Sequence, residues 1–155
     1  LEEPDNLQYA ITRVRLLQMA GRGEDARQFM PRLISRFGYS VEISTLLREV
    51  YGSDGEEAAI NALRTAFNDN PNDARLGFSL ASLLESEGDI AGAETILKTL
   101  ARSLNYRQDV TARLHDFYDS QGRTIDAARV LIEASAQRPE DLSEYAGRMG
   151  RLARL

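Results

Sequence analysis

The sequence predicts an all-α protein built as an α-solenoid, in which antiparallel helix pairs repeat about every 34 residues. The repeating unit is clearest in residues 71–105, where apolar side chains recur at three-and-four spacing on both sides of a turn at Gly88. One small residue stands early in every second helix and sets the period, because its copies lie 33, 34 and 34 residues apart. These copies are Ala26, Ala59, Ala93 and Ala127. A single helix pair leaves an apolar stripe on each helix uncovered, so neighbouring pairs are expected to stack against one another.

Prolines give an independent measure of the same period. Pro4, Pro71 and Pro139 lie 67 and 68 residues apart, which is two repeats each time. At the intermediate positions stand Gly38 and Asn105, which also favour turns. Both measures therefore predict four helix pairs, followed by the opening helix of a fifth.

The first helix pair is expected in residues 7–37, with Asp5 or Asn6 as the cap of its first helix. Its second helix contains Pro31, and an interior proline costs ~3 kcal/mol and bends or breaks a helix. We expect a kink or a lost hydrogen bond there, with three neighbouring side chains still facing the core. They are Phe29, Leu33 and Ile34.

The rest of the chain follows the same pattern. The expected helix pairs span residues 41–67, 72–105 and 110–132, and residues 141–155 form a further helix. In the third pair, Asn72 or Asp73 can cap the first helix and Asp89 can cap the second. The final helix has no partner in this sequence. Part of its apolar face is therefore expected to be exposed and to favour self-association.

One 34-residue unit carries a characteristic set of residues and closes with Pro or Asn. The set is Leu80, Ala81, Leu84, Gly88, Ala93 and Leu97. On these residues the chain resembles the tetratricopeptide repeat (TPR) family, and the resemblance covers nearly the whole chain. It divides residues 1–155, as one solenoid, into repeats at about 7–39, 40–73, 74–107 and 108–141, with a partial fifth repeat at 142–155.

The resemblance implies a right-handed superhelix whose first helices line a concave groove. In this family the groove binds an extended peptide or a helix of a partner protein. Matched position by position, it is expected to carry arginines, hydroxyls and acids, and arginines can bind carboxylates bidentately. These residues are Gln8, Thr12, Arg15, Thr45, Arg48, Arg75, Ser79, Ser82, Asp109, Arg113 and Asp116. The alternative is that they only keep the concave face soluble.

No residue pattern indicates catalysis, a metal or a cofactor. The chain has no cysteine, and its one histidine, His115, is expected to be a packed, hydrogen-bonded ring rather than a general base or a pH-sensitive contact. Residues 21–26 match the loose fingerprint G-x-G-x-x-A, but a helical stripe precedes them where dinucleotide binding needs a strand. Residues 69–73 faintly resemble a calcium loop, but Pro71 stands where a ligand is needed. A turn and a helix-capping loop are favoured, and we predict a non-enzymatic protein.

The charge of the chain bears on its partners. A net charge of −5 argues against bulk binding to nucleic acid. Tyr145, Arg148, Arg151 and Arg154 form a small basic patch that could contact RNA or lipid, although a solvated helix face is the commoner explanation. No apolar run approaches the ~20 residues that a membrane span requires.

Arginine provides 18 of the 19 basic residues, which is typical of GC-rich bacterial genomes. The sequence also starts without Met and ends inside an expected helix, so we expect it to be a piece of a longer protein. Bacterial members of the family include envelope and polysaccharide-export scaffolds. The expected function is therefore binding of a partner protein or peptide within such a protein, with the periplasm favoured over the cytoplasm. The alternative is a structural spacer or self-assembly module.

Overall fold

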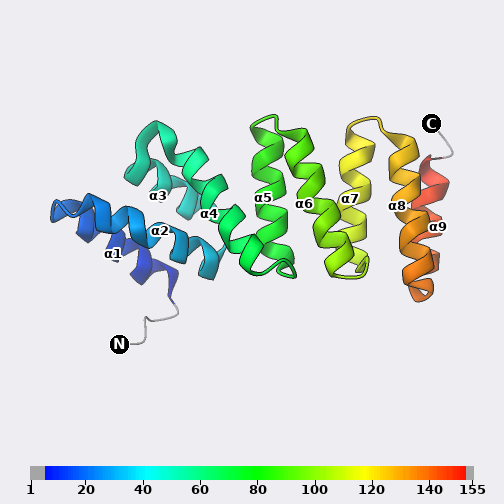
Figure 1. Ribbon diagram of the computed structural model, residues 1–155, viewed down its shortest axis with the longest axis horizontal. Helices are drawn as coiled ribbons and strands as arrows, with labels where there is room; N and C mark the ends of the chain where they lie inside the picture. Colours follow the sequence, from blue (N-terminus) through cyan, green and yellow to red (C-terminus); the bar gives the residue numbers. More distant parts are fainter. Residues whose placement is uncertain (1–5, 153–155) are drawn as a thin grey trace. The chain divides into compact units, whose positions relative to one another are not determined.

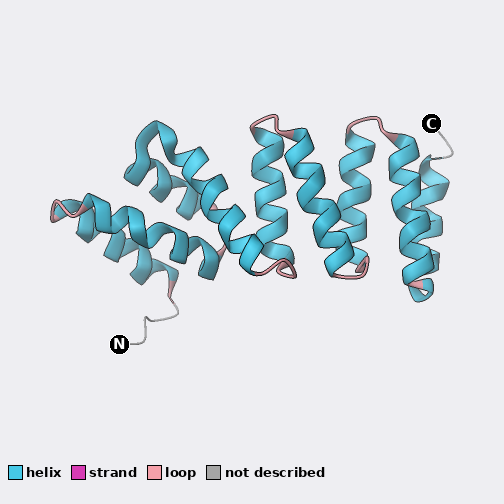
Figure 2. Ribbon diagram, in the orientation of Figure 1, coloured by secondary structure: helices cyan, strands magenta, loops and turns pink. Residues whose placement is uncertain are grey.

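The computed structural model describes the backbone of residues 6–152 and the side chains of residues 6–150. Within these residues the chain is helical, with no strand (Figures 1 and 2), as the sequence predicts. The helices are α1 (Leu7–Met19), α2 (Gly23–Phe37), α3 (Val41–Tyr51), the short 3₁₀ helix η1 (Gly52–Asp54), α4 (Gly55–Asp69), α5 (Ala74–Ser86), α6 (Ile90–Ser103), α7 (Gln108–Ser120), α8 (Thr124–Gln137), the short 3₁₀ helix η2 (Pro139–Asp141) and α9 (Leu142–Leu152).

The helices fall into two compact units, residues 1–70 and residues 71–155. In the first unit α1 packs on α2 and α3 on α4, and α2 also packs on α3 and α4. In the second unit α5 packs on α6, α7 on α8, α6 on α7, and α8 on α9. We call α1, α3, α5, α7 and α9 the first helices, and α2, α4, α6 and α8 the second helices. Within each unit, helix pairs are thus covered by their neighbours in sequence.

The four periodic alanines occupy equivalent places in these units. Each lies early in a second helix, and each is fully buried (0% exposed). A methyl side chain at that point lets the backbone of the neighbouring helix approach closely. The alanines are Ala26, Ala59, Ala93 and Ala127. The period found in the sequence therefore marks equivalent, fully buried positions of the second helices.

Side-chain caps and glycine turns set the helix ends. Asn6, Asp73 and Asp89 accept hydrogen bonds from backbone N–H groups in the first turns of α1, α5 and α6, so these predicted caps are confirmed. After α5, Gly88 adopts φ +80°, and Asp89 N donates to Leu84 O in the Schellman arrangement. Equivalent glycines with positive φ close α1 and α7 in the same way; they are Gly21 and Gly122.

Two connections depart from this pattern. Between α3 and α4 the three connecting residues form the 3₁₀ helix η1. A Cβ added at Gly55, just after η1, would lie 3.2 Å from the backbone of Leu47, which favours glycine there. Between α6 and α7, Asn105 and Tyr106 adopt positive φ values of 48° and 53°. A non-glycine residue in this region costs roughly 1–2 kcal/mol, so the packing around this turn must stabilise it.

Helix α2 continues through Pro31 to Phe37, so the proline does not end the helix. The ring lacks the N–H that an interior residue donates, as expected. Phe29, Leu33 and Ile34 are all buried, which confirms their predicted place in the core. Packing of this face stabilises the helix against the cost of the proline.

Helix α9 covers the end of α8. Its Tyr145 is 2% exposed and packs with Leu131 and Ala134, beside Tyr106. Leu142 and Met149, which flank Tyr145 at three-and-four spacing, are 55% and 37% exposed, so this stripe of α9 is only partly covered. Arg154 lies outside the described residues, and of Arg151 only the backbone is described. Among the helices described, none is both long and apolar enough to span a membrane.

Candidate functional site

In the first unit the predicted groove residues lie on α1 and α3. Gln8, Thr12 and Arg15 are spaced so that they share one face of α1, and Thr45 and Arg48 lie on α3. All five are exposed. The hydroxyls of Thr12 and Thr45 donate to the carbonyl four residues earlier, at 2.8 and 2.9 Å, and they keep their lone pairs for a partner.

A bidentate ion pair links α1 to α3 on this face. Arg15 Nε and Nη2 donate to the carboxylate of Glu49 at 3.0 and 2.9 Å, and Gln18 Nε2 donates to Glu49 O at 2.9 Å. Hydrogen bonding to Glu49 raises the pKa of Arg15. The side chain of Arg15 stays 53% exposed. Glu49 follows Arg48 directly but was not predicted from the sequence, because only the packing of α1 on α3 makes it a partner of Arg15.

In the second unit, the predicted residues near the helix starts pair with side chains two residues earlier in the sequence. On α5, Arg75 pairs with Asp73 at 3.3 Å. On α7, Asp109 accepts from Arg107 at 2.7 and 2.8 Å, and this hydrogen bonding lowers the pKa of Asp109. The two pairs stand one 34-residue repeat apart with their charges exchanged. Equivalent positions on α5 and α7 therefore present opposite charges to a partner.

Further along, ion pairs connect the first helices to one another. Arg113 on α7 donates to the carboxylate of Glu85 and, at 3.4 Å, to the hydroxyl of Ser82, both on α5. Asp116 on α7 accepts from Arg148 on α9 at 2.7 Å. Each guanidinium thus reaches back to the preceding first helix. Ser79, on the same face of α5, is partly buried.

The predicted basic patch on the last helix is wrong for the two members whose side chains are described. Tyr145 is buried, and its hydroxyl lies 3.3 Å from Asp141 and from the carbonyl of Tyr106. The side chain of Arg148 is 16% exposed and pairs with Asp116 and Glu144. Neither residue lies on a solvated face, and the charge of Arg148 is already neutralised.

His115 is a packed, hydrogen-bonded ring, as predicted. It is 4% exposed, and its Nδ1 lies 2.9 Å from Asp116 Oδ1. Its Nε2 is buried without a hydrogen-bond partner among the described residues. Asp116 also binds Arg148, so the imidazole shares its carboxylate partner with an ion pair between α7 and α9.

The dinucleotide-like and calcium-like motifs are a turn and a helix cap in the structure. Residues 21–26 form the turn and first residues of α2, directly after helix α1, so the strand that a dinucleotide fingerprint needs is missing there. In residues 69–73, Asp73 is the cap of α5. Across the described residues, 6–150 for side chains, no group of three His, Cys, Asp or Glu is arranged to hold a metal ion.

A polar network that the sequence analysis missed joins α6, α7 and α8. At its centre is Glu94, which accepts from Arg123 and Lys98 at 2.5 Å and from the Tyr118 hydroxyl at 2.9 Å. Hydrogen bonding to Arg123 first, and to Lys98 and Tyr118, lowers the pKa of Glu94 to about 2 although burial opposes it. The guanidinium of Arg123 also lies 4.6 Å from the centre of the Tyr118 ring.

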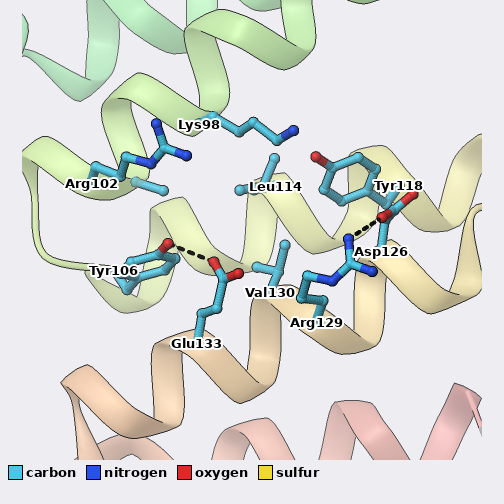
Figure 3. Close-up of a pocket in the computed structure, with 10 residues that line it drawn as sticks. Lys98, Arg102, Tyr106, Leu114, Tyr118, Asp126, Arg129, Val130 and Glu133 are labelled. Atoms are coloured by element: carbon cyan, nitrogen blue, oxygen red, sulfur yellow. Dashed lines mark hydrogen bonds and ion pairs between the residues drawn. The ribbon is translucent and has the colours of Figure 1, made fainter.

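Beside this network lies a small cleft, which we call the α6–α8 cleft (Figure 3), with a volume of about 160 Å³. Two side-chain pairs close it: Tyr106 donates to Glu133 at 2.7 Å, and Arg129 donates to Asp126 at 2.9 Å. Lys98 and Arg102 stand on the α6 side (Figure 3). Paired side chains of α8 therefore line this cleft and narrow it.

Comparison with known proteins gives a fold but no family. No family model matches the chain, and no curated protein matches it. Among solved structures, TTC0263, a thermophilic TPR protein of Thermus thermophilus, matches 99% of this chain and 84% of its own with a TM-score of 0.51 and 23% identity.

Two other solved structures resemble the chain at lower similarity. The MamA protein matches 90% of this chain and 77% of its own, with a TM-score of 0.48 and 18% identity. A putative kinesin light chain of Podosopora anserina with TPR-like repeats aligns over 99% of this chain and 88% of its own length, with a TM-score of 0.48 and 14% identity. The likeness to TTC0263 confirms the predicted fold class, an all-α, TPR-like solenoid.

Proposed function

We propose that this chain is a non-catalytic protein-interaction scaffold that binds a partner protein or peptide along its first helices. The TPR-like fold supports a protein partner. The observation that carries the proposal is a set of polar side chains on the first helices, of which nine are exposed and two, Ser79 and Arg113, are partly buried. The set is Gln8, Thr12, Arg15, Thr45, Arg48, Arg75, Ser79, Ser82, Asp109, Arg113 and Asp116. We call this set the first-helix face, and each unit carries its own part of it.

The ion pairs between first helices support binding by holding each part of the face in one arrangement. Arg15 with Glu49, and Arg113 with Glu85, fix neighbouring helices before a partner arrives. Such preorganisation lowers the entropic cost of association. A partner gains most where charge is still accessible, as at Arg15, whose side chain is half exposed, and at Arg48, which donates only a 3.4 Å hydrogen bond to Ser44.

This accessible chemistry favours a partner segment with carboxylates and hydrogen-bonding groups. Arginine binds carboxylates through two parallel N–H···O bonds, and the threonine hydroxyls beside it can accept a hydrogen bond from backbone N–H. The carboxylates of the face, Asp109 and Asp116, are exposed but already paired with arginines. An acidic segment is therefore the complement of the first unit, whereas the second unit offers a balanced surface.

Photo-crosslinking tests this proposal with threonines as a matched set. A photoreactive phenylalanine analogue replaces Thr12 or Thr45 on first helices, or Thr95 or Thr99 on second helix α6. All four threonines are exposed, and each donates to the carbonyl four residues earlier. In cells that make the protein, Thr12 and Thr45 positions should give one discrete crosslinked product, and Thr95 and Thr99 should not. Crosslinking from the α6 positions alone would contradict the proposal.

Charge reversal at Arg48 then tests the acidic partner. Arg48→Glu should weaken capture of the crosslinked partner by about tenfold, because a bidentate attraction becomes a repulsion. Arg64→Glu, at an exposed position of second helix α4, is the control and should leave capture unchanged. Equal loss in both variants would mean that net charge, and not this face, governs binding.

We further propose that the chain is part of a larger bacterial envelope or polysaccharide-export protein and acts in the periplasm rather than the cytoplasm. This proposal rests on the arginine-rich composition and on the resemblance to scaffolds of that kind. Osmotic-shock fractionation followed by immunoblotting tests it. Recovery of the protein with a cytoplasmic marker would contradict it.

A second candidate function, a spacer or self-assembly module, is favoured by one observation. Helices α8 and α9 expose apolar side chains at Ile132 (56%), Leu142 (55%) and Met149 (37%). If these exposed side chains join two copies of the chain, light scattering should show a mass that rises with protein concentration, and Leu142→Glu should abolish the rise. A monomer mass over the whole concentration range would remove this candidate.

A further inference from the structure

A second cleft, larger than the first, lies between second helices α2 and α4 in the first unit, beside the end of α3. We call it the α2–α4 cleft. Its volume is about 480 Å³, within the roughly 300–1,000 Å³ range of protein ligand sites. Its lining is Pro31, Tyr51, Asp54, Glu57, Ala58, Asn61, Ala62 and Thr65. None of these residues belongs to the first-helix face, so the proposed function does not use this cleft.

The α2–α4 cleft and the α6–α8 cleft are the same place in two repeats. The buried alanines define the offset, because Ala26 and Ala93 lie 67 residues apart and Ala59 and Ala127 lie 68 apart. With these offsets, Tyr51 corresponds to Tyr118, and each tyrosine lines its own cleft. The further correspondences are Pro31 with Lys98, Ala58 with Asp126, Asn61 with Arg129, Ala62 with Val130 and Thr65 with Glu133.

The comparison explains why the α2–α4 cleft is open. In the α6–α8 cleft, Asp126 pairs with Arg129, and Glu133 accepts from Tyr106. The corresponding residues of α4 are an alanine, an asparagine and a threonine, which are too short to span the gap. Where the α6–α8 cleft is narrowed by paired side chains, the α2–α4 cleft is therefore open, with largely apolar walls.

One wall is an aromatic ring held in place. The hydroxyl of Tyr51 donates to Arg27 O at 2.9 Å, and the Arg27 guanidinium lies 5.9 Å from the centre of the ring. Because the hydroxyl is satisfied, the ring can present its carbon atoms to the cleft. Pro31 on α2 and Ala62 on α4 extend this apolar lining.

Carboxylates stand at the rim of the cleft and are available to a cation. Asp54 and Glu57 are both exposed. Asp54 accepts one hydrogen bond, from Ser53 Oγ at 3.0 Å, and among the described residues neither carboxylate forms an ion pair. This contrasts with the α6–α8 cleft, where Asp126 is paired with two arginines, Arg123 and Arg129.

We propose that the α2–α4 cleft is a docking site for a basic segment of a partner protein. The segment inserts one or two leucine-sized side chains between Pro31, Tyr51 and Ala62, and a flanking Lys or Arg pairs with Asp54 or Glu57. The apolar walls select the inserted side chain, and the unpaired carboxylates select the positive charge. This site lies between second helices α2 and α4, with Tyr51 from the end of α3 and Asp54 from η1, and takes a charge opposite to the one expected at Arg15 and Arg48.

Three short peptides measure separately the need for apolar side chains and the need for positive charge. The probe is acetyl-Lys-Lys-Leu-Leu-Lys-Lys-amide with a fluorescent label, titrated by anisotropy against the purified chain. The Ser-Ser counterpart keeps the charge and removes the apolar groups, and the Glu-flanked counterpart keeps the leucines and reverses the charge. The Leu-Leu probe should bind saturably. The Ser-Ser peptide should bind about tenfold more weakly, and the Glu-flanked peptide should not saturate.

Variants of the chain then locate the site. One of them closes the α2–α4 cleft with a side-chain pair copied from the second unit. Ala58→Asp with Asn61→Arg copies the Asp126–Arg129 pair and leaves net charge unchanged, and neither position is buried. This double variant should weaken probe binding by about tenfold. Glu57→Gln should weaken it by about threefold, whereas Glu56→Gln, in the same helical turn but outside the lining, should change it by less than about twofold.

The outcomes decide the proposal in either direction. Equal binding of the Leu-Leu and Ser-Ser peptides overturns it, and this arm uses the unaltered protein, so it does not depend on any variant folding. Unchanged binding by the closed-cleft variant, shown by circular dichroism to be folded, also overturns it. Loss of peptide binding in the closed-cleft variant, with the crosslinks at Thr12 and Thr45 retained, supports a second site independent of the first-helix face.

Discussion

Arg113 on α7 and Glu85 on α5 form an ion pair between two first helices, and their side chains are only 28% and 24% exposed. The same guanidinium lies 3.4 Å from the hydroxyl of Ser82. Partial burial makes such a pair stronger than a solvated one, because water and salt screen it less. The pair therefore joins successive helix pairs by a contact other than apolar packing.

A double-mutant cycle should detect this contact. Arg113→Ala is expected to lower the free energy of unfolding by about 1 kcal/mol, and the coupling with Glu85→Ala should be about 0.5–1 kcal/mol. Urea unfolding followed by circular dichroism gives both values. The control is Arg129→Ala, whose side chain is 61% exposed and whose partner Asp126 lies three residues away on the same helix. A coupling of zero would mean that this ion pair adds nothing to the packing of α7 against α6.

Glu94 predicts acid sensitivity of the second unit. Its pKa of about 2 in the folded protein lies below the ordinary value of 4.5, chiefly because Arg123 hydrogen-bonds the carboxylate. The folded state therefore binds the proton less readily than the unfolded state. The stabilisation is complete above pH 4.5 and is lost as the pH falls from 4.5 towards 2.

Glu94→Gln should remove this dependence. At pH 7 the variant should be less stable by about 1–3 kcal/mol, because Arg123 and Lys98 lose a charged acceptor. Between pH 4.5 and 2 its stability should fall less than that of the unaltered chain. Urea unfolding at several pH values measures the difference, and Glu87→Gln, at an exposed position after α5, is the control. Parallel pH curves for Glu94→Gln and the unaltered protein would contradict the prediction.

The buried alanines predict a strong dependence on side-chain size. Ala93→Leu, at a fully buried position of α6, should destabilise the chain by about 1–3 kcal/mol because the added carbons meet a packed helix. Ala91→Leu, at an exposed position of the same helix, should change stability by less than about 0.5 kcal/mol. Thermal unfolding of the two variants separates the effect of position from that of leucine. Equal melting temperatures would show that Ala93 does not mark a close contact.

Asn105 predicts a preference for glycine in the α6–α7 turn. Its φ of 48° is costly for most side chains, and asparagine tolerates this region better than alanine does. Asn105→Ala should lower the free energy of unfolding by about 1 kcal/mol, whereas Asn105→Gly should leave it unchanged or raise it slightly. Denaturant unfolding of both variants checks the order. An alanine variant as stable as the glycine variant would mean that the turn relaxes to another conformation.

Features that depend on local sequence were predicted well. The caps Asn6, Asp73 and Asp89 and the periodic alanines follow from rules that act within one helix or one turn. The short 3₁₀ helix η1 was not predicted. The connection between α3 and α4 has the same three-residue length as those after α1, α5 and α7, and the apolar pattern does not set it apart.

Features that depend on two helices were not predicted. The basic patch failed because the neighbours of Arg148 include Asp116, which is 32 residues away in sequence and adjacent only once α9 meets α7 in the fold. The Glu94 network requires residues from α6, from α7 and from the cap of α8. The α2–α4 cleft was missed for a related reason, since it exists because side chains at Ala58 and Asn61 are short relative to their counterparts.

The glycines with positive φ after α1, α5 and α7 have a kinetic consequence. Gly21, Gly88 and Gly122 return the chain within a few residues, so the contacts that form first join segments close in sequence. Proteins rich in such contacts fold on the order of microseconds to milliseconds. Nucleation can begin in any hairpin and spread to the next. Damage to one turn should therefore slow folding locally while the remaining hairpins still assemble.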